Sequence, residues 1–334
     1  MGTILAVTRL FSGIQPTGDL HLGNLLGAVQ NWVSDQHRTD SFFCIVDLHA
    51  LTVPKDPGVV AAKTLEVAQV LMASGLDPQT CTLFVQSHVP QHTELTWLMQ
   101  CNTAFGELSR MTQFKEKSDK QRDFISAGLF TYPTLQVADI LLYDTEQVPV
   151  GEDQRQHIEL TRDVAERFNN RYGETFVLPE VVVPTAGARV MDLQEPANKM
   201  SKSAETDAGT ILLTEDLART AKKIRRAVTD SENEVRWDPT DKPGVSNLLG
   251  ILGAATGRDP ESLAAHYEQY GPLKNDTAEA VVELLEPIQR RYAELRDDPA
   301  ETSRLLRVGA EKASGVATGV LDRAIDAVGL LPRS

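Results

Sequence analysis

The hydrophobic residues in the first half of the chain fall into short runs separated by longer amphipathic segments. The short runs are rich in β-branched and aromatic residues, which favours strands. Between them, residues 24–36 and 58–75 carry apolar side chains at helical spacing. The predicted strands are 10–14, 42–46 and 82–86, with 147–150 and 180–184 as later candidates. Strands that alternate with helices predict an α/β fold with a doubly wound parallel sheet.

The pattern changes near residue 205, where strand-like runs cease. Residues 278–295 and 302–331 keep a helical period instead. A chain of 334 residues is long enough for two domains with a core each. We therefore predict a Rossmann-like domain over residues 1–204, with a helical insertion at about 105–145, and a helical C-terminal domain over residues 205–334.

The formal net charge of −14 narrows the possible partners. A general nucleic-acid-binding protein is basic overall, so the charge argues against that class. A local basic surface is still compatible with it, and residues 114–122 and 219–227 are candidates. A solvated helix face is the simpler explanation of both segments.

Hydropathy and cysteine content indicate in which cellular compartment the protein resides. The mean hydropathy is −0.23, and no apolar run approaches the ~18 residues of a membrane-spanning helix. The N-terminus lacks the features of a secretory signal. Cys44, Cys81 and Cys101 lie far apart and form no CxxC pair, so neither a disulfide framework nor a cysteine metal site is indicated. We expect a cytoplasmic protein without a membrane span or a metal centre.

The first candidate site is the glycine-rich segment 11–24, which joins the first predicted strand to a helix. In open α/β sheets, ligands bind beyond the carboxyl ends of strands, where helix N-termini offer N–H groups to phosphates. Gly23 would let a nucleotide approach the backbone closely, and His21 could stabilise an anion. A glycine-rich loop with an exposed histidine and no ligand explains the same residues.

Two further segments add to this picture. Gly151, Glu152 and Asp153 follow another short strand at a helix start, where they could cap the helix or bind ribose hydroxyls. Lys199 and Lys202 lie in a loop that could close on a polyphosphate and stabilise charge on the leaving group. The loop lacks the order of a P-loop, and a pair of lysines is uninformative by itself.

Taken together, these segments resemble a known family. His21-Leu22-Gly23-Asn24 near the N-terminus and Lys199-Met200-Ser201-Lys202-Ser203 after the α/β part resemble the HIGH and KMSKS signatures of the class I aminoacyl-tRNA synthetases. Asn24 replaces the last histidine of the first signature, and the second matches at every position. Longer segments, among them "FSGIQPTGDLHLGNLLGA", "GLFTYPTLQVADILLYDT" and "VPVGEDQRQHIELTRD", resemble the bacterial tryptophanyl-tRNA synthetases.

The resemblance implies a reaction and its participants. ATP activates L-tryptophan to tryptophanyl-adenylate and pyrophosphate, and the tryptophanyl group then passes to tRNA(Trp). Mg²⁺ would accompany ATP, and the family implies a homodimer. Such catalysis depends on positioning and on charge stabilisation at the phosphates, without a covalent enzyme intermediate.

The resemblance also implies roles for individual residues. Those expected to assist catalysis are Gln15, Lys117, Lys199 and Lys202. Those expected to bind ATP are Gln15, Pro16, Thr17, His21, Gly23, Asn24, Gly151, Glu152, Asp153, Val190, Lys199, Met200, Ser201, Lys202 and Ser203. Those expected to surround tryptophan are Phe11, His49, Tyr132, Asp139, Val148, Val150 and Gln154.

Asp139, expected to accept the indole N–H, carries the expected selectivity. A buried acceptor is left unpaired by phenylalanine, and sites of this kind discriminate by roughly 10⁴–10⁵ without proofreading. From the residues alone, Asp139 could equally make a structural hydrogen bond, and His49 is explained as a packed core histidine. Three other functions stay open: a tyrosyl-tRNA synthetase, an auxiliary paralogue, and a nucleotide-binding module without catalysis.

Overall fold

The computed structural model describes residues 7–115, 125–151, 154–182, 189–201 and 207–331. Its sheet has five parallel strands in the order β3-β2-β1-β4-β5. The strands are β1 (Arg9–Ile14), β2 (Asp40–Ile45), β3 (Thr82–Val85), β4 (Gln147–Pro149) and β5 (Glu180–Val182). All five lie where the hydrophobic runs predict them, and the doubly wound α/β fold is confirmed.

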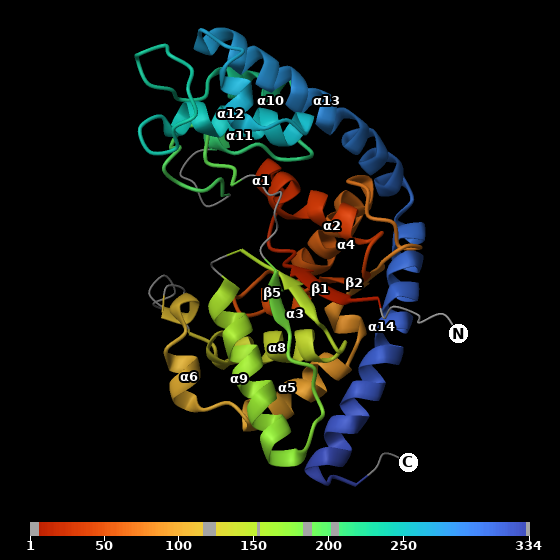
Figure 1. Cartoon of the computed structure of the whole chain (residues 1–334). Helices are drawn as coiled ribbons and strands as arrows, with labels where there is room; N and C mark the ends of the chain where they lie inside the picture. The colour runs from red at the N-terminus through yellow and green to blue at the C-terminus, as the bar shows by residue number, and fades with distance from the viewer. Residues whose placement is uncertain (1–6, 116–124, 152–153, 183–188, 202–206, 332–334) are drawn as a thin grey trace, which may run out of the picture.

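Helices cover both faces of the sheet (Figure 1). The helices of the first two-thirds of the chain are α1 (Leu22–Asn24), the π-helical turn η1 (Leu25–Val29), α2 (Gln30–Asp35), α3 (Asp47–Ala50), α4 (Val59–Ala73), the 3-10 turn η2 (Gln86–His88), α5 (Gln91–Cys101), α6 (Phe105–Ser109), α8 (Ala127–Leu141) and α9 (Arg155–Tyr172). Those that follow are η4 (Asp207–Gly209), α10 (Leu217–Arg225), α11 (Pro243–Thr256), α12 (Pro260–Ala264), α13 (Tyr270–Asp297) and α14 (Pro299–Val328).

Alternate residues of the strands belong to two separate cores. Leu10, Phe43 and Ile45 pack with α2 and α4 in a core that continues into the helical C-terminal part. Phe11 and Phe42 belong to the core of the other face, with α5, α8 and α9. Because side chains alternate across a strand, a strand buried on both faces must be apolar throughout, as the runs in the sequence are.

The last helix, α14, returns from the C-terminal part to the sheet and runs along it (Figure 1). Its contact with β3 is so close that a Cβ at Gly309 would lie 1.9 Å from the Leu83 carbonyl oxygen. Glycine at this position therefore sets how near the helix can approach the strand.

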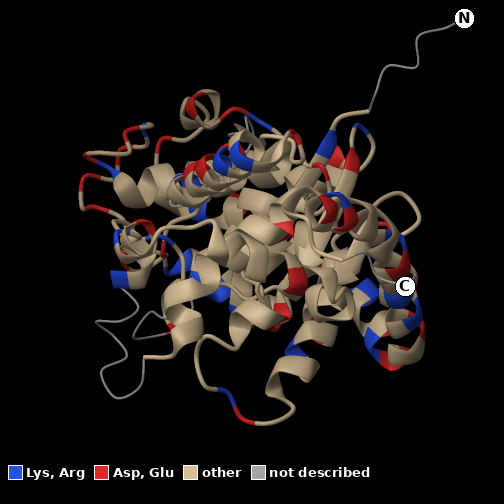
Figure 2. Cartoon of the chain, turned by 90° about the horizontal axis from the view of Figure 1, so that it is seen from below, with Lys and Arg blue, Asp and Glu red and all other residues tan. Residues whose placement is uncertain are grey.

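Charged side chains of both signs are scattered over the periphery, while the central elements are largely free of them (Figure 2). Among the described residues, no helix combines the length and the apolar character needed to cross a bilayer.

Candidate active site

From β1 the sheet grows in both directions: β2 and then β3 are added on one side of it, and β4 and then β5 on the other. Ligands of open α/β sheets bind at such a point, beyond the carboxyl ends of the strands. Residues 15–24 follow the carboxyl end of β1, and Gly151 and Gln154 follow that of β4. The segments at 11–24 and 148–163, far apart in the sequence, therefore meet at one edge of the sheet.

At this edge the helix α1 begins at Leu22, and His21 is the residue that caps its N-terminus. His21 is buried, which contradicts the alternative of a loop with an exposed histidine. The Asn24 side-chain oxygen accepts a hydrogen bond from the His21 backbone N–H at 3.1 Å. The group that Asn24 can offer to a ligand is thus its amide N–H₂. A Cβ at Gly23 would lie 3.0 Å from His21 Nδ1 and 3.6 Å from Val190 Cβ, so Gly23 joins the first signature to Val190 at close range.

Lys199 and Met200 of the second signature lie on a short antiparallel hairpin. Met191 bridges to Lys199, and the Met200 N–H donates to the Val190 carbonyl at 3.0 Å. Val190 and Met200 are buried, whereas Lys199 is exposed. The hairpin therefore uses its apolar residues as an anchor and leaves the Lys199 ammonium group accessible.

The two signatures are tied together by the chain that follows the second one. The Leu22 N–H donates to the Ile211 carbonyl at 2.8 Å, and the Leu213 N–H donates to the Leu20 carbonyl at 2.9 Å. Thr210 Oγ1 also donates to the Ser201 carbonyl at 2.9 Å. Backbone pairing on both sides of His21 thus fixes the start of α1 against the segment after the lysine-containing hairpin.

Asn247 of α11 clamps the hairpin from the C-terminal part. Its Nδ2 donates to the Met191 carbonyl and its Oδ1 accepts from the Met191 N–H, both at 2.9 Å. The two bonds use every backbone hydrogen-bonding group of Met191. The position of the lysine-containing hairpin therefore depends on a residue of the helical C-terminal part.

Asp139 of α8 lies buried in a cluster of three hydrogen-bond donors. His49 Nε2 lies 2.8 Å from its Oδ2, while Gln86 Nε2 and His92 Nδ1 each lie 2.6 Å from its Oδ1. His92 Nε2 is 2.7 Å from the Tyr143 hydroxyl. Burial alone would raise the pKa of Asp139, but the hydrogen bond from His49 and the contacts with His92 outweigh it and lower the pKa to about 2. The carboxylate is therefore ionised at neutral pH, and burial raises the pKa of Tyr143 so that its hydroxyl stays protonated.

The inner face of α8 carries Tyr132, Gln136 and Asp139, which are spaced four and three residues apart and so share one side of the helix. Gln136 Nε2 lies 3.5 Å from Gln154 Oε1 at the start of α9. The Tyr132 ring packs edge-on against His49, with 6.1 Å between ring centroids. These contacts link Tyr132 to Asp139 through His49, and Gln154 to the same helix through Gln136.

The remaining predicted residues have more varied positions. Gln15 and Thr17 are exposed beyond β1 and Pro16 is buried. Phe11 and Val148 are buried in the sheet, and Val150 is half-buried at its edge. Five predicted site residues lie outside the described residues: Lys117, Glu152, Asp153, Lys202 and Ser203.

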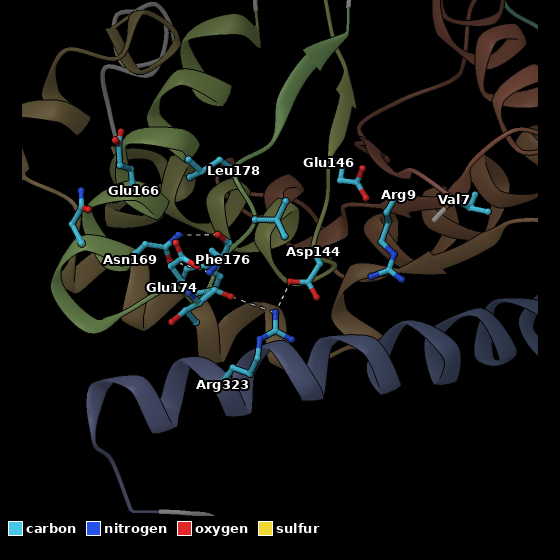
Figure 3. A pocket seen from close by; sticks show the side chains of 13 residues that line it. Val7, Arg9, Asp144, Glu146, Glu166, Asn169, Glu174, Phe176, Leu178 and Arg323 are labelled. Atoms are coloured by element: carbon cyan, nitrogen blue, oxygen red, sulfur yellow. Dashed lines mark hydrogen bonds and ion pairs between the residues drawn. The ribbon is translucent and has the colours of Figure 1, made fainter. Parts of the chain in front are cut away.

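Two pockets elsewhere are lined by none of the predicted site residues. A pocket of about 790 Å³ lies at the opposite, amino-terminal end of β1 and β4 (Figure 3). Arg323 of α14 reaches across it to Asp144. A second pocket of about 970 Å³ lies between η1, the hairpin and α11, beside Trp237.

Four residues that act at this site were not predicted from the sequence: Gln86, His92, Tyr143 and Asn247. Gln86 is the last residue of the predicted strand 82–86 and His92 follows that strand, so polar side chains at the end of a buried strand are a signal that could have found them. Tyr143 and Asn247 carry no comparable signal, because their roles depend on contacts with distant parts of the chain.

The chain is similar to known proteins of one family. The family model described as "tRNA synthetases class I (W and Y)" matches residues 6–286, most of the chain. The chain belongs to this family. Membership of the tryptophan and tyrosine group of class I synthetases explains the Rossmann-like sheet and the two signatures.

Individual relatives are similar over their full length. The chain is 52% identical to "Tryptophan--tRNA ligase" of Mycobacterium leprae, covering 100% of this chain and 99% of the relative. The crystal structure of tryptophanyl-tRNA synthetase from Mycoplasma pneumoniae superposes with a TM-score of 0.90 at 37% identity, covering 97% and 98% of the two chains. That from Campylobacter jejuni, complexed with ADP and tryptophan, gives 0.82 at 34% identity, covering 97% and 100%.

Proposed function

We propose that this class I synthetase is a tryptophan—tRNA ligase, which activates L-tryptophan with ATP and transfers the tryptophanyl group to tRNA(Trp). The observation that carries the proposal is the ionised, buried Asp139 carboxylate, which is bonded to His49 and shares one face of α8 with Tyr132 and Gln136. The full-length similarity to tryptophan—tRNA ligases supports the same substrate.

ATP is the energy-supplying substrate, and the start of α1 is its proposed binding surface. Gly23, Asn24 and Val190 would contact the nucleoside part, and the hairpin with Lys199 would contact the phosphates. Gly151, Glu152 and Asp153 are proposed to complete this surface, and Lys117, Lys202 and Ser203 to act on the phosphates. Mg²⁺ would accompany ATP and offset part of the charge on its phosphates.

Tryptophan would lie against α8, with its indole N–H donated to Asp139 and its ammonium group near Tyr132 and Gln154. Phe11, His49, Val148 and Val150 are the proposed walls of the pocket. A phenylalanine side chain would leave the buried carboxylate without this donor, and a loss of this type discriminates by roughly 10⁴–10⁵.

The proposed division of labour places catalysis in residues 1–204 and contacts to the anticodon side of tRNA in residues 205–334. The basic segment 219–227 offers fewer positive charges to RNA than its composition suggests. Lys223 is buried and donates to the Thr210 carbonyl at 2.7 Å and to Glu215 at 2.6 Å, so it holds the fold and is not offered to RNA. Lys222 and Arg226 are exposed on the same segment and are the proposed phosphate contacts.

A homodimer in the cytoplasm is part of the proposal. Trp97 of α5 and Phe105 of α6 are 66% and 76% exposed, large values for aromatic side chains. Exposed aromatic groups are typical of a surface that another chain covers. Analytical ultracentrifugation of the purified protein tests this part, and a species of one chain mass would contradict it.

Amino-acid-dependent exchange of pyrophosphate into ATP, measured without tRNA, tests the proposed activity. Exchange with tryptophan and not with tyrosine is the expected result. Exchange with tyrosine alone would identify the sister enzyme and overturn the assignment of Asp139. A folded protein that binds ATP without exchange of either kind would favour the non-catalytic nucleotide-binding module.

A further inference from the structure

A chain of hydrogen bonds runs from Tyr143 through His92 to Asp139, and none of the predicted site roles includes the first two residues. Tyr143 and His92 are fully buried. The Tyr143 ring is stacked on Phe11 at 5.6 Å and on Phe42 at 4.8 Å between centroids. Because Tyr143 is packed between these two rings, its hydroxyl oxygen is fixed in position. The hydrogen bond between this hydroxyl and His92 therefore fixes the His92 ring as well.

The geometry determines which groups donate to Asp139. An ionised Asp139 only accepts, so His92 must donate through Nδ1. On the other side of its ring, His92 Nε2 lies 2.7 Å from the Tyr143 hydroxyl. Gln86 is oriented in the same way, because its Oε1 accepts from the Leu48 backbone N–H at 3.1 Å and its Nε2 therefore faces Asp139.

These donors are distributed unequally over the carboxylate. Oδ1 accepts from both Gln86 and His92, whereas among the described residues Oδ2 accepts from His49 alone. A carboxylate has about four acceptor positions, so Oδ2 keeps capacity for one further N–H. His49 also packs against Tyr132, which places Oδ2 on the side of the proposed tryptophan pocket.

We propose that His92 and Tyr143 are positioning residues for substrate selection: they hold Oδ1 so that Oδ2 of Asp139 is presented to the indole N–H. This inference rests on the proposed function and deepens it. Neither residue touches the substrate, and both act through the orientation of the carboxylate. Their removal should therefore weaken recognition of the indole N–H more than any other step.

The test compares tryptophan with its sulfur analogue, 3-(benzothiophen-3-yl)alanine, in which S replaces the indole N–H. Pyrophosphate exchange is measured with both substrates for the wild type and for Tyr143→Phe, which removes the hydroxyl and keeps the stacked ring. We expect the preference for tryptophan in kcat/KM to fall about tenfold, a loss of the size expected for one hydrogen bond to a charged group. The change should appear in KM for tryptophan, with kcat nearly unchanged and with little effect on the analogue.

Two further variants separate positioning from packing. His92→Asn keeps an N–H donor near Asp139, whereas His92→Leu removes it, so the asparagine variant should retain more of the preference than the leucine variant. Tyr270→Phe is the matched control, because it removes another buried tyrosine hydroxyl, one bonded to Asp230 far from the site. It should leave the preference unchanged.

The outcomes are distinguishable from failure of the proposed function. A preference unchanged in Tyr143→Phe, or an equal loss for both substrates, would overturn the positioning role. Equal preferences in His92→Asn and His92→Leu would do the same. Absence of tryptophan-dependent exchange in the wild type would instead overturn the proposed function itself.

Discussion

Replacing Gly309 with alanine should destabilise the fold, although alanine is the better helix former. The new Cβ would lie 1.9 Å from the Leu83 carbonyl oxygen and 2.8 Å from its carbon, so α14 or β3 must move. Overpacking of this kind costs about 1–3 kcal/mol. The neighbour is backbone and cannot rotate away, so we take a cost of about 3 kcal/mol. The gain in helix propensity is about 1 kcal/mol, which leaves a net destabilisation of about 2 kcal/mol.

Gly315 supplies the matched control on the same helix. A Cβ there meets no atom within 4 Å, so Gly315→Ala should stabilise the protein by up to about 1 kcal/mol. Urea denaturation followed by circular dichroism measures the free energy of unfolding of both variants. A difference of about 3 kcal/mol between them, with opposite signs, is expected. Equal changes in the two variants would refute the close contact between α14 and β3.

Three further changes test the site. Lys199→Ala should lower the rate of tryptophan activation by about 10²-fold while tryptophan affinity, measured by calorimetry, changes little; a loss of affinity alone would contradict the assignment to the phosphates. Asn247→Ala leaves both backbone groups of Met191 without their partner, so it should cost about 1–3 kcal/mol of stability in urea denaturation and raise KM for ATP in exchange assays. The pKa of Asp139 is lowered from 3.8 to about 2, so its ionisation stabilises the fold by about 2 kcal/mol above pH ~4, and this contribution is lost as the pH falls through about 2. The difference in unfolding free energy between wild type and Asp139→Asn should accordingly be constant from pH 7 to 5 and shrink in acid, and a difference independent of pH down to 3 would contradict the ionised state.

Much of the fold was predictable, because its signals are local. A strand buried on both faces is largely apolar, so the central strands stand out as short runs such as 42–46 and 82–86. The site was predictable in part, because glycine and lysine signatures are contiguous in the chain. Asp139 illustrates the limit: its sequence neighbours are apolar, and the residues that keep it ionised come from α3, η2 and α5.

The sequence by itself determined the order of strands and helices along the chain, the two signatures, and the candidate residues for binding ATP and tryptophan. Periodicity and short motifs depend on neighbours within a few residues, and such information is present before the chain folds. Only the tertiary structure decided which oxygen of Asp139 is hydrogen-bonded to His92 and that Asn247 binds the lysine-containing hairpin. It also decided that Lys223 is buried and bonded to the Thr210 carbonyl. Each of these depends on atoms that are far apart along the chain and come within hydrogen-bonding distance only when the sheet edge and the C-terminal helices are packed together.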